Sequence, residues 1–494
     1  MTRLSQATLD RLPGDVVRPP YDRAAVRRGV VHIGIGAFHR AHQAAVFDDV
    51  LARGDMRWGI TAASLRSPAV RDQMAPQDGL YTMLVRDGTG ETCRIIGAVG
   101  EVLVAPEQAG ALLAALAHPD THIVTLTITE KGYRLDPATG ALNADDPQVA
   151  ADMASLTAPQ TAPGFLVAAL AMRRAAGLAP FTAISCDNLP HNGALLRAAV
   201  IALAERHDPA LAAWIAAEGA FPQTMVDRIV PATTDADVAA LAGRLSVEDR
   251  AMVKTEPFIQ WVIEDNFCGP RPDFGAGVQI TAAVAPWEEA KLRLLNGAHS
   301  GIAYLGGLAG IAHVHEVLAL PEARRFVEAL WDESAGTLSP PPELDIAAYR
   351  TALMARFDNP ALMHRTRQIA MDGSQKLPQR LCAPVAARLA AGATDGEGIA
   401  AMTLAIAAWV RWQSGVDDSG TAHAVDDPLA ADIAALLDGA GDAAGRVARI
   451  LTAGAVFPPA LAENVIFRRT LVRWLEILED KGALGALAIF AGEP

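Results

Sequence analysis

The fold of this chain is decided by the stretch Val30-Val-His-Ile-Gly-Ile-Gly-Ala-Phe-His-Arg-Ala-His-Gln43. A short β-branched run is followed by a glycine pair and an amphipathic segment, which predicts a strand, a tight turn and a helix. That arrangement offers backbone N–H groups to a pyrophosphate. The third glycine of the pattern Gly-x-Gly-x-x-Gly is absent, because His39 occupies its position. Taken alone, the stretch is only weak evidence for a dinucleotide site.

Strand-like and helical patterns alternate through the first half of the chain. Trp58–Ala63 and His122–Ile128 read as strands, and Glu107–Ala117 reads as a helix. This alternation predicts a parallel, doubly wound sheet. After residue 286 the strand patterns nearly vanish and Ala/Leu-rich helical patterns replace them. We therefore expect an α/β protein, with a Rossmann-type doubly wound domain over residues 1–285, including extensions, and a mainly α-helical domain over residues 286–494.

A second stretch, Lys291-Leu-Arg-Leu-Leu-Asn-Gly-Ala-His-Ser300, sets polar side chains inside an apolar helical pattern. At about 100° per residue, Asn296 and His299 lie roughly 140° and 80° around a helix from Lys291, so all three share one face. A lysine packed against leucines loses solvation, its pKa falls, and it can accept a proton near neutral pH. An amphipathic helix with a lysine that extends to solvent would explain the segment equally well.

The two stretches together resemble the signatures of the mannitol dehydrogenase family, the polyol-specific long-chain dehydrogenases. Both Gly-x-Gly-x-Phe-x-Arg and Lys-x-x-x-x-Asn-x-x-His are intact here. The resemblance implies hydride transfer between a nicotinamide and a secondary alcohol or ketone. It continues along most of the chain, through the segments Thr125–Tyr133, Ser185–Pro190, Met225–Pro231, Glu256–Asp265 and Asp372–Pro378.

Such a reaction needs a group that exchanges the alcohol proton and donors for the developing alkoxide. Lys291 is expected to be that acid or base. The resemblance implies that Asn188 and Asn296 each donate an amide N–H to the reacting oxygen. His299, one turn after Asn296, is expected to hydrogen-bond the substrate and orient it.

Two carboxylates complete the expected site. Asp227 would accept a hydrogen bond from a substrate hydroxyl, and Glu288 would relay protons or hold the charge of the lysine three residues later. Simpler explanations stay open for single residues. Asn188 is also a suitable turn residue before Pro190, and Asp227 is a candidate ion-pair partner of Arg228.

The type of nicotinamide cofactor is less clearly marked. NAD-specific members of the family carry an acidic residue soon after the second strand, whereas this chain reads Ala63-Ser-Leu-Arg-Ser-Pro68, with no carboxylate before Asp72. Arg66 would suit a 2′-phosphate. We expect NAD(H) from the resemblance, with NADP(H) left open. The residues expected at the cofactor are Gly34, Gly36, Phe38, Arg40, Ser64, Arg66, Thr127, Thr129 and Glu130.

The expected substrate follows from a position at which this sequence differs from the polyol dehydrogenases. Mannitol 2-dehydrogenases place an arginine just before the Asp-Gly-Ser motif, and Gln368 stands there in this chain. The surrounding segment His364–Arg380 instead resembles the fructuronate reductases, or D-mannonate oxidoreductases, which act on a sugar acid. A substrate carboxylate needs a cation, and a guanidinium fork suits it best. The segment offers Arg365, Arg367, Lys376 and Arg380, although surface salt bridges would explain some of them.

We therefore expect a D-mannonate:NAD⁺ 5-oxidoreductase, with mannitol 2-dehydrogenase or a related polyol dehydrogenase as the alternative. Arg365 is the first candidate for the carboxylate. A remoter alternative is a dinucleotide-binding protein without catalysis, against which the complete Lys/Asn/Asn/His set argues. The expected substrate-binding residues are Asp227, Arg365, Gln368 and Lys376.

Two other dehydrogenase classes do not fit the sequence. A short-chain enzyme needs Tyr-x-x-x-Lys, and none of the 5 tyrosines has a lysine four positions later. A zinc alcohol dehydrogenase needs a Cys/His ligand set. The pairs His39/His42 and His313/His315 could each supply ligands, but neither comes with a suitable cysteine or carboxylate. We expect the chemistry to be independent of metal.

The amino-acid composition limits which binding partners and which cellular compartment we expect for this chain. With 494 residues and 51% apolar content, the chain can bury a large core. A net charge of −14 disfavours nucleic acids and anionic membranes, which leaves a small sugar acid or polyol. The 4 cysteines lie far apart, as expected for thiols in a reducing compartment. No stretch has the roughly 18 apolar residues of a spanning helix. We expect a cytoplasmic monomer or small homo-oligomer.

Overall fold

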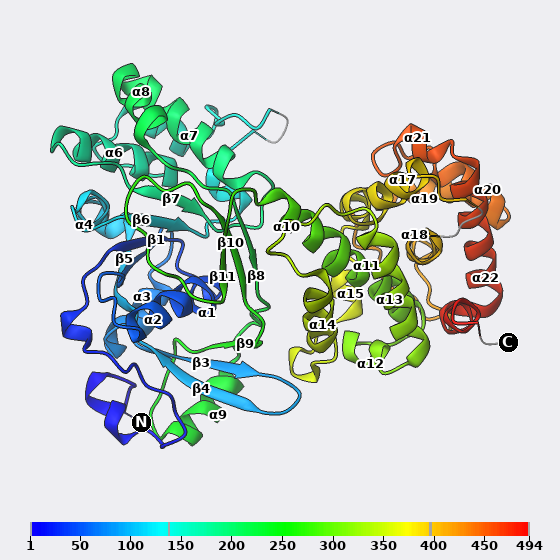
Figure 1. Cartoon of the computed structure of the whole chain (residues 1–494), viewed down its shortest axis with the longest axis horizontal. Coiled ribbons are helices and arrows are strands. Elements are labelled where there is room, and N and C mark those ends of the chain that lie inside the picture. The colour runs from blue at the N-terminus through cyan, green and yellow to red at the C-terminus, as the bar shows by residue number, and fades with distance from the viewer. Residues whose placement is uncertain (1, 137–138, 395–397, 493–494) are drawn as a thin grey trace. The chain divides into compact units, whose positions relative to one another are not determined.

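The computed structural model describes residues 2–136, 139–394 and 398–492. The chain forms two compact units, residues 1–284 and residues 285–494 (Figure 1). None of the helices in the described ranges is long and apolar enough to span a membrane.

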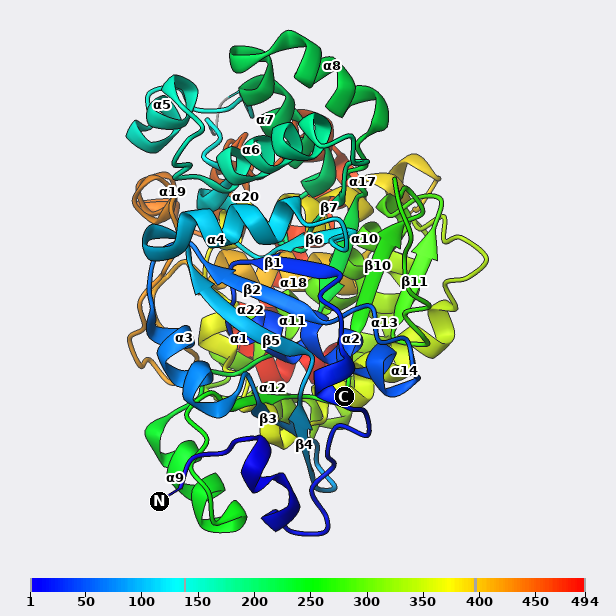
Figure 2. The same cartoon turned by 90° about the vertical axis from the view of Figure 1, so that its left-hand side faces the viewer.

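The first unit is built on a five-stranded sheet with the order β5-β2-β1-β6-β7 (Figure 2). Every neighbouring pair in it is parallel, and β1 pairs with both β2 and β6 in register, Val30 lying opposite Ile60 on one side and Ile123 on the other. The predicted doubly wound parallel sheet is confirmed. Its strands are β1 (Val30–Ile33), β2 (Ile60–Ser64), β5 (Val99–Val104), β6 (Ile123–Leu126) and β7 (Thr182–Ser185).

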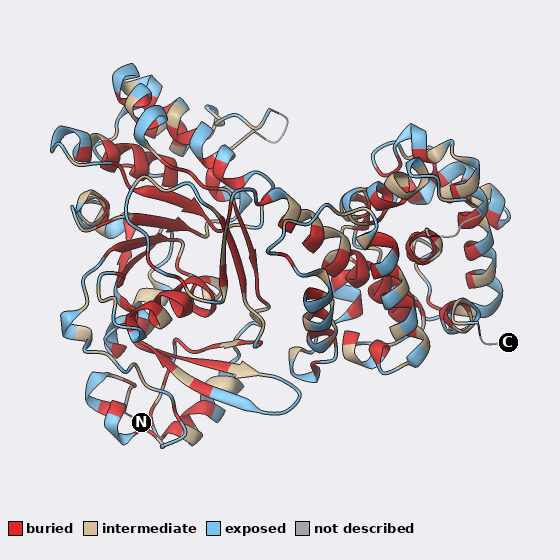
Figure 3. Ribbon diagram, viewed as in Figure 1, coloured by how far each residue is buried: buried red, intermediate tan, exposed pale blue. Residues whose placement is uncertain are grey.

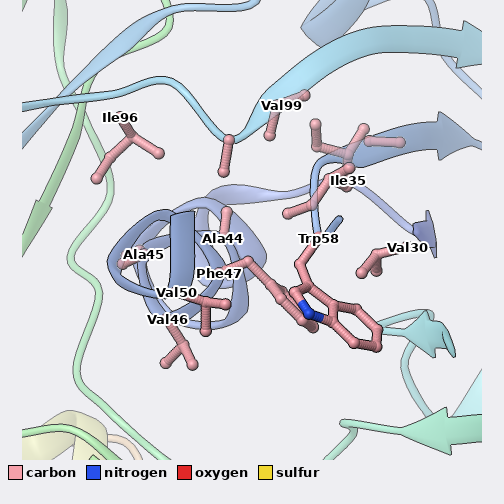
Figure 4. Close-up of a cluster of buried hydrophobic side chains, with 14 of the residues drawn as sticks. Val30, Ile35, Ala44, Ala45, Val46, Phe47, Val50, Trp58, Ile96 and Val99 are labelled. Atoms are coloured by element: carbon pink, nitrogen blue, oxygen red, sulfur yellow. The ribbon is translucent and has the colours of Figure 1, made fainter. Parts of the chain in front are cut away.

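Helices cover both faces of this sheet, which explains why its strands are apolar without alternation. Val30 belongs to a core cluster with Phe47 and Trp58, in which side chains of α2 pack against the sheet (Figure 4). The next residue, Val31, belongs to a second cluster on the other face, with Phe165 of α6. The helices of this part of the first unit are α1 (Ala37–Ala41), α2 (Gln43–Ala52), α3 (Ala69–Met74), α4 (Ala105–Ala117), α5 (Pro147–Ala154), α6 (Ala162–Ala175), α7 (Asn192–His207) and α8 (Pro209–Glu218).

Two smaller sheets extend the first unit. In one, β8 (Thr224–Asp227) runs antiparallel to β10 (Gln260–Glu264), and β11 (Val278–Thr281) lies on the other side of β10. In the other, β3 pairs antiparallel with β4 and parallel with β9. These elements are β3 (Tyr81–Arg86), β4 (Glu91–Ile96), β9 (Val253–Thr255) and the helix α9 (Asp235–Leu245).

The second unit is helical, as predicted, and its described residues contain no strand longer than an isolated bridge. Its central helix α18 (Ala400–Trp412) is buried on nearly every side and packs against α11 and α22 (Figure 3). A helix that is apolar all round is a core helix. The others are α10 (Ala285–Ala290), α11 (Gly297–Leu308), α12 (Val314–Leu318), α13 (Pro321–Ala335), α14 (Ile346–Phe357), α15 (Thr366–Ile369), α16 (Gly373–Leu377), α17 (Ala383–Ala390), α19 (Ala430–Leu437), α20 (Ala443–Ile450), α21 (Pro459–Ala462) and α22 (Val465–Phe490).

Two turns of the second unit are π-helical. The first, η5 (Lys291–Asn296), joins α10 to α11, and the second, η7 (Pro378–Cys382), joins α16 to α17. The two turns pack against each other. A π-turn bonds residue i to i+5 instead of i+4, so it inserts an extra residue into a helix, and such turns are frequent at functional sites. The expected spacing of 100° per residue between Lys291 and Asn296 is therefore wrong, although both residues lie on one continuous helical segment.

Candidate active site

The first unit contains a cavity at the carboxyl ends of its central strands. Its volume is about 430 Å³, and it is lined by residues that follow β1, β2 and β6. Strand β1 lies between β2 and β6, so the chain connections leave it in opposite directions at this point. Open α/β sheets bind ligands at such a crevice. Five of the residues expected at the cofactor line this cavity: Gly34, Ser64, Arg66, Thr127 and Thr129.

The two signature glycines have different structural roles. Gly34 has a φ of 101°, and a Cβ there would lie 2.1 Å from the carbonyl oxygen of Thr127. No other residue fits this turn. Gly36 has ordinary extended backbone, and a Cβ there would meet only the carbonyl oxygen of Gly34, at 3.8 Å. Because Gly36 has no side chain, a pyrophosphate can approach the backbone closely at this turn. This is the role that the glycine pattern assigns to its second glycine.

A stacked pair of histidines replaces the missing third glycine. The rings of His39 and His32 are 3.3 Å apart between centroids and nearly parallel. The two ring nitrogens of His32 contact the hydroxyls of Thr125, at 2.8 Å, and Thr127, at 3.0 Å. Burial lowers the pKa of His32 to about 3 and holds the pKa of His39 well below its usual value. Both rings are therefore neutral at pH 7, and helix α1 packs on β1 through two flat uncharged rings.

Four other residues expected at the cofactor do not line this cavity: Gly36, Phe38, Arg40 and Glu130. Arg40 is buried, and its guanidinium donates to the carbonyl oxygens of Gly36 and Ala251. Phe38 stacks on His42, with 5.0 Å between ring centroids. The signature arginine thus ties α1 to the segment before β9. Sequence analysis missed this role because Ala251 is 211 residues away.

Asp187 joins the segments that follow β6 and β7. Its carboxylate accepts hydrogen bonds from the backbone N–H groups of Ile128, at 3.1 Å, and Thr129, at 2.9 Å, and from the hydroxyl of Tyr133, at 2.7 Å. Burial raises the pKa of Asp187, and these three donors act against that shift. Asn188 is the next residue and is exposed at the end of β7. Sequence analysis did not single out Asp187, because its partners are 54 to 59 residues away.

Asp227 is the last residue of β8 and is 8% exposed. The guanidinium of the following residue, Arg228, donates to the carbonyl oxygens of Ala41 and Glu256. Burial lowers the pKa of Arg228 to about 10. The loop after β7 is fixed beside β8 by Asn192, whose amide donates to the carbonyl oxygen of Thr224 at 3.0 Å.

In the second unit, the three polar residues of the second signature lie along η5 and α11. Lys291 is 7% exposed and His299 is 8% exposed, whereas Asn296 is partly exposed. Lys291 is therefore desolvated, which is the environment that the general-base hypothesis requires. Glu288 lies on α10, in the turn before Lys291, and is partly exposed.

His299 sits in an apolar and cationic environment. Its ring lies 4.7 Å from that of Phe357 and 5.1 Å from that of His364, measured between centroids. Burial holds the pKa of His299 well below its usual value, and His364, Arg356 and Arg380 add to this shift. Burial also lowers the pKa of His364 to about 4. His299 is therefore a neutral ring at pH 7, suited to hydrogen bonding and not to supplying a proton.

The segment His364–Arg380 places its cations in different surroundings. Arg365 and Gln368 are exposed. The ammonium of Lys376 lies 2.5 Å from the carbonyl oxygen of Met371. Arg380 lies in η7, where its Nη1 donates to the hydroxyl of Ser300 at 3.2 Å. Of these cations, Arg380 is the one with a hydrogen bond to the helix that carries His299.

Comparison with known proteins identifies the family of this chain. Residues 28–275 match the model of the mannitol dehydrogenase Rossmann domain, and residues 283–478 match that of the mannitol dehydrogenase C-terminal domain. The chain belongs to the mannitol dehydrogenase family. It is an oxidoreductase of that family, and the family resemblance inferred from the two signatures is confirmed.

Relatives across the family align with almost the whole chain. The uncharacterized oxidoreductase YeiQ of Escherichia coli is 45% identical over 95% of this chain and 96% of its own length. The D-mannonate oxidoreductase of E. coli is 42% identical over 96% of this chain and 98% of its own. The solved structure of Pseudomonas fluorescens mannitol 2-dehydrogenase, a ternary complex with NAD and D-mannitol, is 38% identical, covers both chains completely and has a TM-score of 0.79.

The different roles of the two glycines lead to a prediction. Gly34→Ala should lower the free energy of unfolding by about 2 kcal/mol or more, because a Cβ combines positive φ with a steric clash. Gly36→Ala should fold like the natural protein but bind NADH more weakly, because its Cβ occupies the open space at the turn. Chemical denaturation and NADH fluorescence titration measure the two effects. Equal stability of the two variants would contradict the assigned roles.

Proposed function

We propose that this protein is an NAD(H)-linked D-mannonate 5-oxidoreductase, which interconverts D-fructuronate and D-mannonate. The observation that carries the proposal is the presence of two cations, Lys376 and Arg380, in one helical segment. This segment lies beside the signature helix, the continuous helical stretch of η5 and α11 that carries Lys291, Asn296 and His299. A sugar acid needs such a cation, whereas a neutral polyol does not. The identity to the D-mannonate oxidoreductase supports the same substrate but does not separate it from mannitol, because a mannitol 2-dehydrogenase of Pyrenophora tritici-repentis is also 42% identical.

The chemistry assigns a distinct task to each signature residue. The bound nicotinamide supplies or accepts the hydride. Lys291 gives a proton to the ketone oxygen during reduction and takes it back during oxidation. Asn188 and Asn296 each donate an amide N–H to that oxygen, where negative charge develops. His299 is neutral and orients a substrate hydroxyl through a hydrogen bond. Asp227 accepts from another hydroxyl, and Glu288 exchanges protons with the lysine.

The proposed base can be tested by removing it. Lys291→Ala should lower kcat by at least about 10²-fold, the usual scale for losing a general acid or base. NADH affinity should stay nearly unchanged, because the cavity that fits the nucleotide is lined by other residues. Lys481→Ala is the matched control, because the Lys481 side chain is exposed and pairs with Asp480. A Lys291→Ala enzyme within a few-fold of the natural rate would end the assignment.

The substrate can be tested with a panel of ketoses. With NADH as donor, D-fructuronate should be reduced with a kcat/KM at least about 10²-fold higher than D-fructose, because a cation placed for a carboxylate is left without its partner by a neutral sugar. Tagaturonate serves as the epimeric sugar acid in the same panel. Preference for fructose, or for mannitol in the reverse direction, would favour the polyol dehydrogenase alternative.

The cofactor proposal depends on the turn after β2. The hydroxyl of Ser64 accepts from the backbone N–H of Ser67 at 3.1 Å. The guanidinium of Arg66 is exposed at the cavity and forms no ion pair within the part of the chain that the structure describes. No carboxylate is present among the described residues of the lining. We propose NAD(H) as the main cofactor, with the 2′-phosphate of NADP(H) tolerated beside Arg66.

This tolerance predicts a measurable selectivity. NADPH should bind the natural protein within about tenfold of NADH, because a charged hydrogen bond from Arg66 compensates for the added phosphate. Arg66→Ala should weaken NADPH binding by about tenfold and NADH binding by less than twofold. Titration of the bound-nucleotide fluorescence gives both dissociation constants. Equal losses for the two nucleotides would show that Arg66 does not distinguish them.

A further inference from the structure

Among the described residues of the second unit, Arg380 is a cation without a counter-ion. Arg380 is partly buried in the π-turn η7. Its Nη1 donates to the hydroxyl of Ser300 at 3.2 Å and lies 3.4 Å from the carbonyl oxygen of Asn296. Both acceptors are neutral. Within the described ranges, no carboxylate lies within ion-pair distance of this guanidinium, and its other nitrogens have no hydrogen-bond partner.

The acidic groups that act on the neighbouring Lys376 are Asp372 and Asp427, and both are already engaged. Asp427 accepts hydrogen bonds from the backbone N–H and the hydroxyl of Ser374. Asp372 is the partner of Lys376, at 3.7 Å. Neither carboxylate neutralises Arg380. Among the described residues, the Nε and Nη2 atoms of Arg380 have no partner, so they can donate hydrogen bonds to an anion from outside the chain.

The electrostatic surroundings make a positive charge unfavourable in the absence of an anion. Burial lowers the pKa of Arg380 to about 10. Burial also lowers the pKa of Lys376, and repulsion from Arg380 adds to that shift. Two like charges that lose solvation together destabilise the empty site, and a bound carboxylate would relieve both penalties. Since Arg380 keeps partial exposure, an anion can reach it.

The position of Arg380 links this anion site to the signature helix. Asn296 and Ser300 are its two acceptors, and His299 lies between them in the sequence. The charge of Arg380 also contributes to the lowered pKa of His299, so the two side chains are close enough to interact electrostatically. An anion bound to Arg380 would therefore lie beside the residues proposed to bind the sugar.

We infer that Arg380 binds the substrate carboxylate through the part of its guanidinium fork that has no partner in the chain. This inference rests on the proposed function and names the residue that would select a sugar acid over a neutral sugar. It replaces the expectation that Arg365 has this role. The side chain of Arg365 is exposed, and solvent already stabilises its charge. Arg380 is the cation that gains most from an anionic partner.

The test compares an acid and a neutral sugar in charge-altering variants. Arg380→Met should lower kcat/KM for D-fructuronate by about 30-fold or more, while kcat/KM for D-fructose changes by less than about threefold. Arg380→Lys should retain part of the preference, because the charge remains without the fork. Arg473→Leu is the matched control, since it removes an exposed guanidinium from α22 of the same unit.

A purely structural role of Arg380 predicts a different pattern. If the guanidinium only clamps η7 to α11, both substrates should lose activity equally in Arg380→Met, and the inference would be overturned. Loss of the acid preference in Arg365→Leu, with the preference intact in Arg380→Met, would also overturn it and restore Arg365. A natural enzyme that prefers fructose would instead refute the proposed function, so the two failures can be told apart.

A second measurement uses the natural protein and does not depend on the folding of a variant. Phenylglyoxal modifies accessible arginines, and peptide mass spectrometry quantifies the product at Arg380. D-Mannonate with NAD⁺ should slow modification of Arg380 by at least about fivefold, whereas D-mannitol with NAD⁺ should protect much less. Modification of Arg473 should be insensitive to both. Equal protection by the acid and the polyol would count against a carboxylate contact.

Discussion

The parallel pairing of β1 with both β2 and β6 is the constraint on which the first unit depends. Because β1 occupies the centre of the sheet, the chain must turn sharply where this strand ends, and Gly34 makes that turn with a φ of 101°. The carbonyl oxygen of Thr127, after β6, fills the space that a side chain at Gly34 would need. Two segments that line the cavity, those after β1 and after β6, therefore pass close to each other through their backbones.

Neutral aromatic packing allows this turn to depart from the usual glycine pattern. The third glycine normally lets a helix lie close to the first strand. Here the rings of His32 and His39 stack, and burial keeps both uncharged at pH 7. A charged imidazolium in either position would face its neighbour across 3.3 Å without water. The pair therefore works as a flat apolar spacer, stabilised by hydroxyls of β6 and the segment after it.

The second unit relies on a different constraint, the packing of two π-turns. Each π-turn widens its helix, and the widened turns η5 and η7 meet at Gly297, where a Cβ would lie 3.2 Å from the carbonyl oxygen of Arg380. This contact places the guanidinium of Arg380 beside the helical segment of Asn296 and His299. It also buries polar groups that an ordinary amphipathic helix would leave in solvent. Burial changes the acid–base properties of these groups, and this change makes the segment suitable for chemistry.

Local properties of the sequence determined much of the fold and part of the site. The strand, turn and helix around Gly34 could be predicted because the need for positive φ and the length of an apolar run are properties of neighbouring residues. The helical character of the second unit follows from periodicity in the same way, and the two signatures identified the family. The roles of Asn188, Asp227, Lys291 and His299 are hypotheses from those signatures, and the structure adds burial and position to them.

Tertiary structure decided what depends on distant neighbours. The burial of Arg40 against Ala251, the anchoring of the turn after β6 by Asp187, and the antiparallel pairing of β8 with β10 all join residues far apart in the chain. The π-turn at Lys291 packs against η7, which lies far along the chain, and a regular helical period does not predict such a turn. Arg365 and Arg380 look alike in sequence. Only the fold leaves Arg365 in solvent and Arg380 partly buried, without a counter-ion among the described residues. A charge is stabilised or destabilised by the groups that surround it in space.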